Sequence, residues 1–380
     1  MTLREKIVLE IRDRGPIPFS RYMELCLYDP ELGYYSRNTE QFGKAGDFYT
    51  SSDVHAVFGR LLARQFEEMW RVLGAPAQIE ILELGPGRGL FACDVLDWSA
   101  KKFPDFFSVV HYSALETSPA LREKLGATLG NHFAAGKGKV LAVPSQRLFE
   151  RAFASEVPLI VFANEFFDAL PVEVVSPDGE LRISEKDGRF VETWAGVSAE
   201  EMDFLDRYSV HPEIGERVEV PLLAQRYMAE VAAGVGRGFF IVVDYGYTRQ
   251  EQLAGRHRGT VTAYRRHGVC ANPYEAPGEQ DITAHVNFTS LAGAAEQQGM
   301  EMQALLTQAQ FLMGIGEQNQ FADAFEECRL PQERAKVALQ LKHLVTPAGM
   351  GEAFHVLVAG KGLERKRIDG LSGLSFGRRP

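Results

Sequence analysis

The sequence predicts an α/β protein built on a mostly parallel β-sheet with helices on both faces. Three observations predict this class: short apolar runs alternate with amphipathic segments, the run at 79–84 ends in a glycine-rich turn, and the 380 residues have a globular composition. Alternating strand and helix patterns are typical of parallel sheets. Hydrophobic residues make up 45% of the chain, which excludes a disordered protein and allows a large core.

Six apolar runs predict the strands. They cover residues 79–84, 111–116, 140–143, 158–163, 239–244 and 353–359. Apolar side chains at three- and four-residue steps predict helices over 3–11, 54–73 and 119–129, and a further helix follows the glycine turn. The aromatic-rich stretch 19–49 is interleaved with glycine and proline, so we expect irregular structure there.

These elements divide into a core with additions. The core is expected to consist of residues 76–171, 237–246 and 287–362. Residues 172–236 and 247–286 are interpreted as two insertions that form a substrate-side subdomain, the first with a hairpin across Asp187-Gly188. An N-terminal extension, 1–75, is expected to be helical and irregular and to cover the ligand site, and 363–380 form a basic tail.

Composition excludes several classes of protein. The net charge of −10 argues against a nucleic-acid partner, because a basic field supplies most of that affinity. No apolar run reaches the roughly 18 residues of a membrane span, so we expect no membrane insertion. The first residues resemble no leader peptide, and we expect a cytoplasmic protein. The four cysteines and nine histidines show no metal-ligand spacing, so no metal is expected.

The turn after the first strand predicts a nucleotide-type site. It consists of Gly85, Pro86, Gly87, Arg88 and Gly89. Glycines let the backbone approach a ligand closely, and the following helix adds a partial positive charge. A dinucleotide fingerprint would place its third glycine where Leu90 stands, and the Gly-Lys-Ser/Thr of a phosphate-binding loop is absent.

Two acidic residues indicate which ligand the turn holds. Glu83 precedes the first glycine by two residues and would repel a phosphate but attract an ammonium group. Glu116, at the end of the second strand, can accept both ribose hydroxyls of an adenosine. A ligand with a ribose, an α-amino group and no phosphate fits S-adenosyl-L-methionine. The plain alternative is that both are ordinary acids at strand ends.

The motifs and their order resemble one family along most of the chain. The matching stretches are residues 28–35, 46–51, 83–89, 116–122, 163–171, 244–246, 263–265, 280–286 and 349–351. Together they resemble the MidA family, which comprises the complex I assembly-factor protein arginine methyltransferases of mitochondria and their bacterial relatives. The resemblance implies the class I methyltransferase (Rossmann-like) fold with a mostly parallel seven-stranded sheet, and S-adenosyl-L-methionine as cofactor.

The resemblance also implies roles for individual residues. Residues expected to bind the cofactor, besides Glu83, the glycine turn and Glu116, are Asp47, Tyr49, Thr50, Thr117 and Asn164. Residues 164–168 should lie beside the transferable methyl group. Two positions depart from the family pattern: Ser52-Asp53 replaces Pro-Glu, and Asn287 replaces an aspartate, which puts in doubt an acidic role for that position.

The candidate catalytic residues suit an arginine acceptor. A guanidinium is always protonated, and two carboxylates would orient it and localise its charge. Glu165 and Asp168 follow the fourth strand at the ligand-binding edge of the sheet and are the candidates, with Asn164 beside them. Alternatively, Asp168 caps the following turn and Glu165 is solvated. His285 is a candidate to contact the acceptor, and a structural histidine is the alternative.

We therefore expect a methyltransferase with a protein substrate, for which the resemblance suggests a respiratory complex I subunit. A homodimer is left open. Two further hypotheses stay open from the sequence. The first is an enzyme that methylates a small molecule at oxygen or nitrogen, and the second is an assembly factor that binds the cofactor without catalysis.

Overall fold

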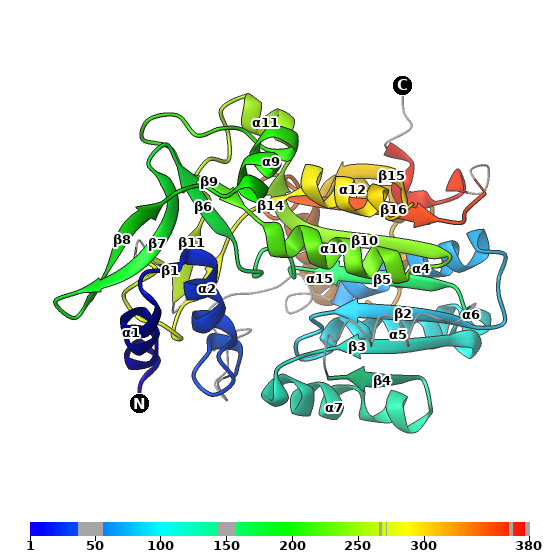
Figure 1. The fold of residues 1–380 in the computed structure, drawn as a ribbon. Coiled ribbons are helices and arrows are strands. Elements are labelled where there is room, and N and C mark those ends of the chain that lie inside the picture. The colour runs from blue at the N-terminus through cyan, green and yellow to red at the C-terminus, as the bar shows by residue number, and fades with distance from the viewer. Residues whose placement is uncertain (37–55, 143–156, 266–267, 271, 365–367, 377–380) are drawn as a thin grey trace. The chain divides into compact units, whose positions relative to one another are not determined.

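The computed structural model describes residues 1–36, 56–142, 157–265, 268–270, 272–364 and 368–376 (Figure 1). The chain forms two compact units. Unit 1 consists of Met1–Phe48, Glu165–Ala229 and Tyr245–Ala294, and unit 2 consists of Tyr49–Asn164, Glu230–Asp244 and Ala295–Pro380. Residues 172–229 and 247–286 of the two expected insertions belong to unit 1 together with residues 1–36, whereas residues 230–236 of the first insertion and residues 56–75 of the expected extension belong to unit 2.

Unit 2 contains the central sheet. Its strands lie in the order β15 (Glu301–Thr307), β16 (Phe354–Lys361), β10 (Gly238–Tyr247), β5 (Leu159–Asn164), β2 (Ile79–Leu84), β3 (Val110–Leu115) and β4 (Gly138–Leu141). The pairs from β10 to β4 are parallel and β15–β16 is antiparallel. The last residues of β10 pair with β14 (Val286–Asn287), so within the described residues the sheet has eight strands, where seven were expected. The expected mostly parallel α/β fold is confirmed.

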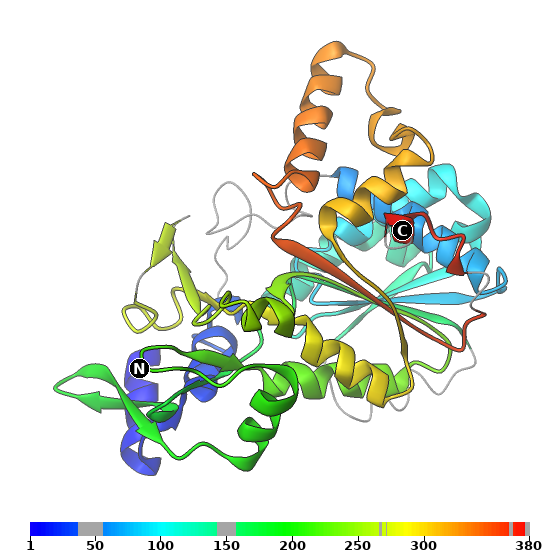
Figure 2. The ribbon, with the colours of Figure 1, turned by 90° about the horizontal axis from the view of Figure 1, so that it is seen from above.

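Helices lie on both sides of this twisted sheet (Figure 2). Those wholly within unit 2 are α4 (Ala56–Val72), α5 (Leu90–Lys102), α6 (Pro104–Val109), α7 (Pro119–Ala134), α13 (Gln308–Glu317), α14 (Ala322–Phe325) and α15 (Pro331–Val345), with the short η2 (Ser372–Leu374). The ring of Phe91 on α5 stacks on Phe162 of β5 with centroids 4.5 Å apart. Ser118 caps α7 and Pro119 occupies its first turn, both favourable at a helix start.

Unit 1 contains two small antiparallel sheets. One consists of β1 (Ile17–Pro18), β7 (Gly179–Lys186), β6 (Glu173–Ser176) and β9 (Val218–Val220), with β8 (Arg189–Ala195) beside β7. The other consists of β12 (Gly268–Cys270), β11 (Thr262–Arg265) and β13 (Asp281–Thr283). The expected hairpin is confirmed: Lys186 lies opposite Arg189, and Asp187 and Gly188 both have positive φ, as the tight hairpin turn requires.

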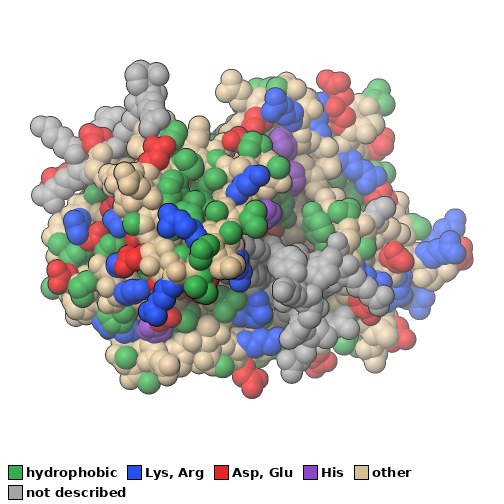
Figure 3. Space-filling model, turned by 180° about the vertical axis from the view of Figure 1, so that it is seen from behind, with side chains coloured by type: hydrophobic (Ala, Val, Ile, Leu, Met, Phe, Trp, Pro, Cys, Tyr) green, Lys and Arg blue, Asp and Glu red, His purple; other side chains and the backbone are tan. Residues whose placement is uncertain are grey.

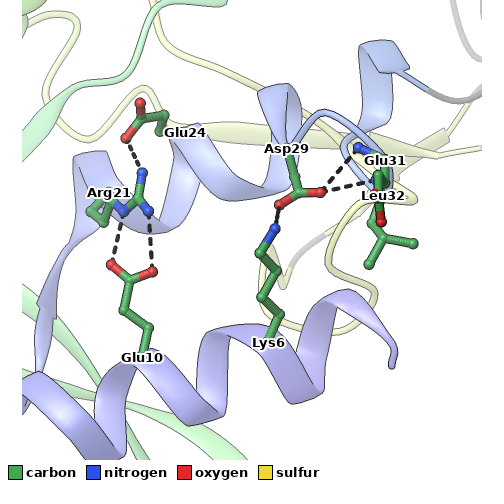
Figure 4. Close-up of polar contacts among 7 residues, drawn as sticks. All are labelled: Lys6, Glu10, Arg21, Glu24, Asp29, Glu31 and Leu32. Atoms are coloured by element: carbon green, nitrogen blue, oxygen red, sulfur yellow. Dashed lines mark hydrogen bonds and ion pairs between the residues drawn. The ribbon is translucent and has the colours of Figure 1, made fainter.

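The helices of unit 1 are α1 (Leu3–Arg14), α2 (Phe19–Tyr28), η1 (Tyr34–Ser36), α9 (Ala199–Tyr208) and α11 (Arg249–Leu253). Ion pairs join α1 to α2 (Figure 4). Arg21 donates to both carboxylate oxygens of Glu10 at 2.9 and 3.1 Å, and Lys6 pairs with Asp29 just after α2. Two further helices, α10 (Leu222–Gly234) and α12 (Phe288–Gln297), cross from one unit to the other.

Residues 19–28 correct one expectation. We expected irregular structure there, and the structure has helix α2. Phe19, Tyr22, Met23 and Cys26 are all buried and recur at three- and four-residue steps, which is one helical face. The expectation rested on the glycines and proline interleaved through 19–49, but Pro30 lies beyond the end of α2, and Pro18 lies at its N-cap, where proline is tolerated.

Lys and Arg are interspersed with Asp and Glu on the face drawn in Figure 3, without one large field of a single sign. Among the described residues, no helix combines the length and the apolar character needed to cross a bilayer.

Candidate active site

The glycine turn joins β2 to α5 in a conformation that few other residues adopt. Gly85, Gly87 and Gly89 have φ values of +64°, +54° and +77°. A Cβ at Gly89 would lie 2.4 Å from Leu125 Cδ1 on α7, whereas one at Gly87 would meet nothing within 4 Å. Gly89 therefore allows close helix packing, and Gly87 leaves open space at the turn.

Glu83 lies buried at the carboxyl end of β2. Its side chain accepts a 2.8 Å hydrogen bond from the hydroxyl of Tyr112, and the residue is 4% exposed. Burial raises the pKa of Glu83 to about 8, and the nearby negative charge of Glu116 adds to this rise. A cation placed beside Glu83 would stabilise its ionised form, so the group suits an ammonium ligand.

Glu116 lies just beyond β3 and faces the glycine turn. The backbone N–H groups of Ser118, at 2.8 Å, and of Gly87 donate to its carboxylate. Burial nevertheless raises the pKa of Glu116 to about 7. Thr117, the next residue, is exposed, and its carbonyl accepts a bond from Arg122. Unit 2 thus brings together Glu83, the glycine turn and Glu116.

The expected catalytic residues follow β5. Asn164 is the last residue of β5 and is half-buried, like Glu165. Glu165 has a φ of +50°, a left-handed conformation that costs free energy in a non-glycine residue and clusters at functional sites. Asp168 is 6% exposed. Burial raises its pKa to about 6, opposed by hydrogen bonds from Tyr245 and from backbone N–H groups at 168 and 169.

A second buried carboxylate is Asp281, at the start of β13. Like Asp168, it lies close enough to Tyr35 and Tyr264 for its negative charge to raise the pKa of both tyrosines. The residue is 2% exposed, and Tyr35 donates a 2.8 Å hydrogen bond to its Oδ1. Burial raises the pKa of both Tyr35 and Tyr264, and the negative charges of Asp168 and Asp281 raise each further. The backbone of Ala284 also donates to the Asp168 carbonyl, which ties the end of β13 to this segment.

His285 packs against two other rings, those of His257 and Tyr245. Its Nδ1 lies 3.2 Å from Nδ1 of His257, and its ring meets that of Tyr245 edge-on with centroids 5.2 Å apart. Burial, followed by the neighbouring His257, lowers the pKa of His285 to about 4, so the ring is neutral at pH 7. The side chain of Tyr245 also donates a hydrogen bond to Asp168, so Tyr245 contacts both His285 and the Asp168 carboxylate.

A family of S-adenosyl-L-methionine-dependent methyltransferases has a sequence model that matches residues 61–306 of the chain. The chain belongs to this methyltransferase family. The protein is therefore an S-adenosyl-L-methionine-dependent enzyme, and the expectations of the cofactor, the reaction class and the family resemblance are confirmed. Glu83, the glycine turn and Glu116 fit that cofactor, since two carboxyl groups flank a turn with open space.

Relatives and solved structures agree with this methyltransferase assignment. The chain is 28% identical to the "Protein arginine methyltransferase NDUFAF7 homolog, mitochondrial" of Drosophila melanogaster, over 97% of this chain and 87% of that one. It is 27% identical to the human protein arginine methyltransferase NDUFAF7, over 96% and 84%. A Burkholderia thailandensis protein crystallised with S-adenosyl-homocysteine superposes with a TM-score of 0.82, at 28% identity over 98% and 94%.

These relatives correct the expected location of the methyltransferase. We expected a cytoplasmic protein, and the curated relatives are named as mitochondrial, so that expectation is wrong on this comparison. It rested on the absence of a leader pattern in the first residues, and such an absence carries no information about the compartment.

Three expected cofactor residues of the methyltransferase, Asp47, Tyr49 and Thr50, lie outside the described residues, as do Ser52 and Asp53. The other departure from the family pattern has a structural explanation. Asn287 accepts a 3.0 Å bond from the Ser290 backbone at the start of α12 and donates one to the Tyr208 carbonyl. Asn287 is thus a buried helix cap.

Asp281, Tyr35 and Tyr264, which the structure groups with Asp168, were not among the residues expected at the site. All three lie in stretches that carry the family resemblance, at 28–35, 263–265 and 280–286, and that was the available signal. Sequence separation concealed their proximity, because Tyr35 and Asp281 are 246 positions apart.

Proposed function

We propose that this methyltransferase transfers a methyl group to an arginine side chain of a partner protein. The names of its relatives support this acceptor, since they are called protein arginine methyltransferases at 27–28% identity over most of both chains. The observation that carries the proposal is a pair of buried carboxylates in unit 1, Asp168 and Asp281. Both lie near the same two tyrosines, Tyr35 and Tyr264, and raise the pKa of each.

Two carboxylates suit a guanidinium better than a neutral acceptor. The guanidinium keeps its charge at any physiological pH, and its planar N–H groups match carboxylate oxygens in pairs. Asp168 and Asp281 would orient the group and draw its charge away from the attacking nitrogen. The rings of Tyr35 and Tyr264 add flat surfaces that attract a cation.

S-adenosyl-L-methionine, when bound, supplies a methyl group on a sulfonium, which needs little activation. Glu83 would hold its ammonium group and Glu116 its ribose hydroxyls, while the glycine turn lets the backbone approach. The chain's task is then to align the acceptor nitrogen and to exclude water. Asn164 and Glu165, at the end of β5, are proposed to help align it.

The acceptor loses a proton when its nitrogen gains a methyl group. Asp168 is proposed to accept that proton, because its pKa of about 6 lies close to neutral pH. His285 is proposed to act through Tyr245, which contacts its ring and donates to Asp168. His285 is thus a positioning residue in this scheme.

The family resemblance suggests a respiratory complex I subunit as the partner protein. A homodimer stays a prediction.

The decisive experiment incubates the enzyme with S-adenosyl-L-methionine labelled on its methyl group and with lysate of its own organism. Mass spectrometry then maps the labelled residue. We expect a labelled arginine in one protein. Asp168→Asn and Asp281→Asn should each lower the rate about 100-fold, since each loses one grip on the guanidinium. Cofactor affinity should stay within several-fold of wild type.

Asp203→Asn is the matched control, because Asp203 is an exposed aspartate on α9 of the same unit. It should leave the rate unchanged. Label in a small molecule alone would replace the proposal with a small-molecule methyltransferase. Binding of S-adenosyl-homocysteine without any transfer would indicate a factor that uses the cofactor only for assembly. Full turnover in a double variant that combines Asp168→Asn with Asp281→Asn would remove the carboxylate pair from the acceptor site.

A further inference from the structure

Three different metal-ligand side chains meet on the surface of unit 2. Cys93 and Asp97 lie one turn apart on α5, and His132 lies in the last turn of α7. His132 Nε2 lies 2.8 Å from Asp97 Oδ1, and Cys93 Sγ lies 3.5 Å from Asp97 Oδ2. One potential ligand atom from each side chain lies within 4.8 Å of the other two.

The donor types select a particular class of metal ion. Thiolate and imidazole favour zinc and similar transition metals over magnesium and calcium, which prefer oxygen ligands alone. A sulfur, a nitrogen and a carboxylate oxygen are three of the four ligands of tetrahedral zinc. Asp97 is 66% exposed at its side chain, so water can fill the fourth position.

We propose that Cys93, Asp97 and His132 bind a zinc ion. On binding, the Cys93 thiol gives its proton to solvent and forms the sulfur–zinc bond. His132 coordinates through a neutral ring nitrogen and Asp97 through a carboxylate oxygen, and no redox change occurs. The metal cross-links α5, which begins at the glycine turn, to α7, on which Gly89 packs.

The proposed site differs from the sequence expectation of no metal, because its ligands come from two helices and show no ligand spacing along the chain. Cys93 and His132 are 39 positions apart, and the only local signal is the four-residue step from Cys93 to Asp97. A four-residue step between two such side chains is common on helices, so it does not indicate a metal site without the third ligand.

The test uses the full chain without a histidine tag, stripped of metal by a chelator and then titrated with cobalt(II). We expect the near-ultraviolet charge-transfer band of a cobalt–thiolate bond, lost when equimolar zinc is added. Zinc calorimetry in two buffers of different protonation enthalpy should detect the released proton. Neither measurement involves methyl transfer, so each tests the zinc proposal independently of the proposed function.

Ligand variants decide the assignment. Cys93→Ser should lack the cobalt band, and His132→Gln and Asp97→Asn should each weaken zinc binding at least about tenfold. Cys328→Ser, which removes a partly buried thiol elsewhere in the same unit, should keep the band. Asp97 is exposed, so its variant remains informative if Cys93→Ser does not fold. The absence of a band in wild type, or an unchanged band in Cys93→Ser, would overturn the proposal.

Discussion

The hydroxyl of Tyr112 donates a 2.8 Å hydrogen bond to Oε2 of Glu83, a carboxyl group buried where β2 meets the glycine turn. This single bond does not offset the loss of water around the carboxyl group, because burial still raises the pKa of Glu83 to about 8. At neutral pH the free enzyme therefore holds much of Glu83 protonated, and a bound cation would be needed to ionise it.

Cofactor affinity should accordingly depend on pH through Glu83. A cationic ligand lowers the pKa of Glu83, so binding below pH 8 releases a proton and affinity rises as pH increases toward 8. Glu83→Gln should weaken the binding of S-adenosyl-homocysteine by about 10- to 100-fold at pH 8, the usual loss for a charged hydrogen bond. The variant should also flatten the pH dependence measured by calorimetry.

Glu80→Gln provides the matched control on the same strand. Glu80 is partly exposed and bonds to Ser113 and Lys139. The Glu80→Gln variant should bind S-adenosyl-homocysteine with the same affinity as wild type at every pH. The same pH dependence in Glu83→Gln as in wild type would assign the titration to another group.

Gly89→Ala should destabilise unit 2 by about 1–3 kcal/mol, the usual cost of overpacking. The new Cβ would lie 2.4 Å from Leu125 Cδ1, and the φ of +77° strains any side chain. Thermal or urea unfolding measures the loss. Gly126→Ala on α7 is the control: its Cβ would meet nothing within 4 Å, so alanine should raise stability by about 0.5–1 kcal/mol. Equal effects of the two variants would contradict this packing argument.

The sequence predicted the central strands because buried parallel strands appear as short apolar runs. The run at 79–84 matches β2 residue for residue, and Glu83 was identified from its position before the glycines. Strand β15 escaped prediction, since all but one of its residues are at least partly exposed and its pattern is mixed. The grouping of Asp281 with Tyr35 was not predicted, because the two residues lie 246 positions apart in the sequence.

The neighbouring histidines His257 and His285 of unit 1 should make stability fall in mild acid. Burial and His257 lower the pKa of His285 to about 4 in the folded protein, below the 6.5 of an ordinary histidine. The unfolded chain therefore binds more protons between pH 6.5 and 4, and the free energy of unfolding decreases as pH falls through that window. His285→Gln should remove about 1–2 kcal/mol of the difference in unfolding free energy between pH 7 and 5, measured by urea denaturation.

His211→Gln, which removes a half-exposed histidine of the same unit, should leave the difference as it is in wild type. A pH profile unchanged by His285→Gln would show that the pair does not resist protonation, and that the 3.2 Å approach of the two Nδ1 atoms carries no energetic consequence.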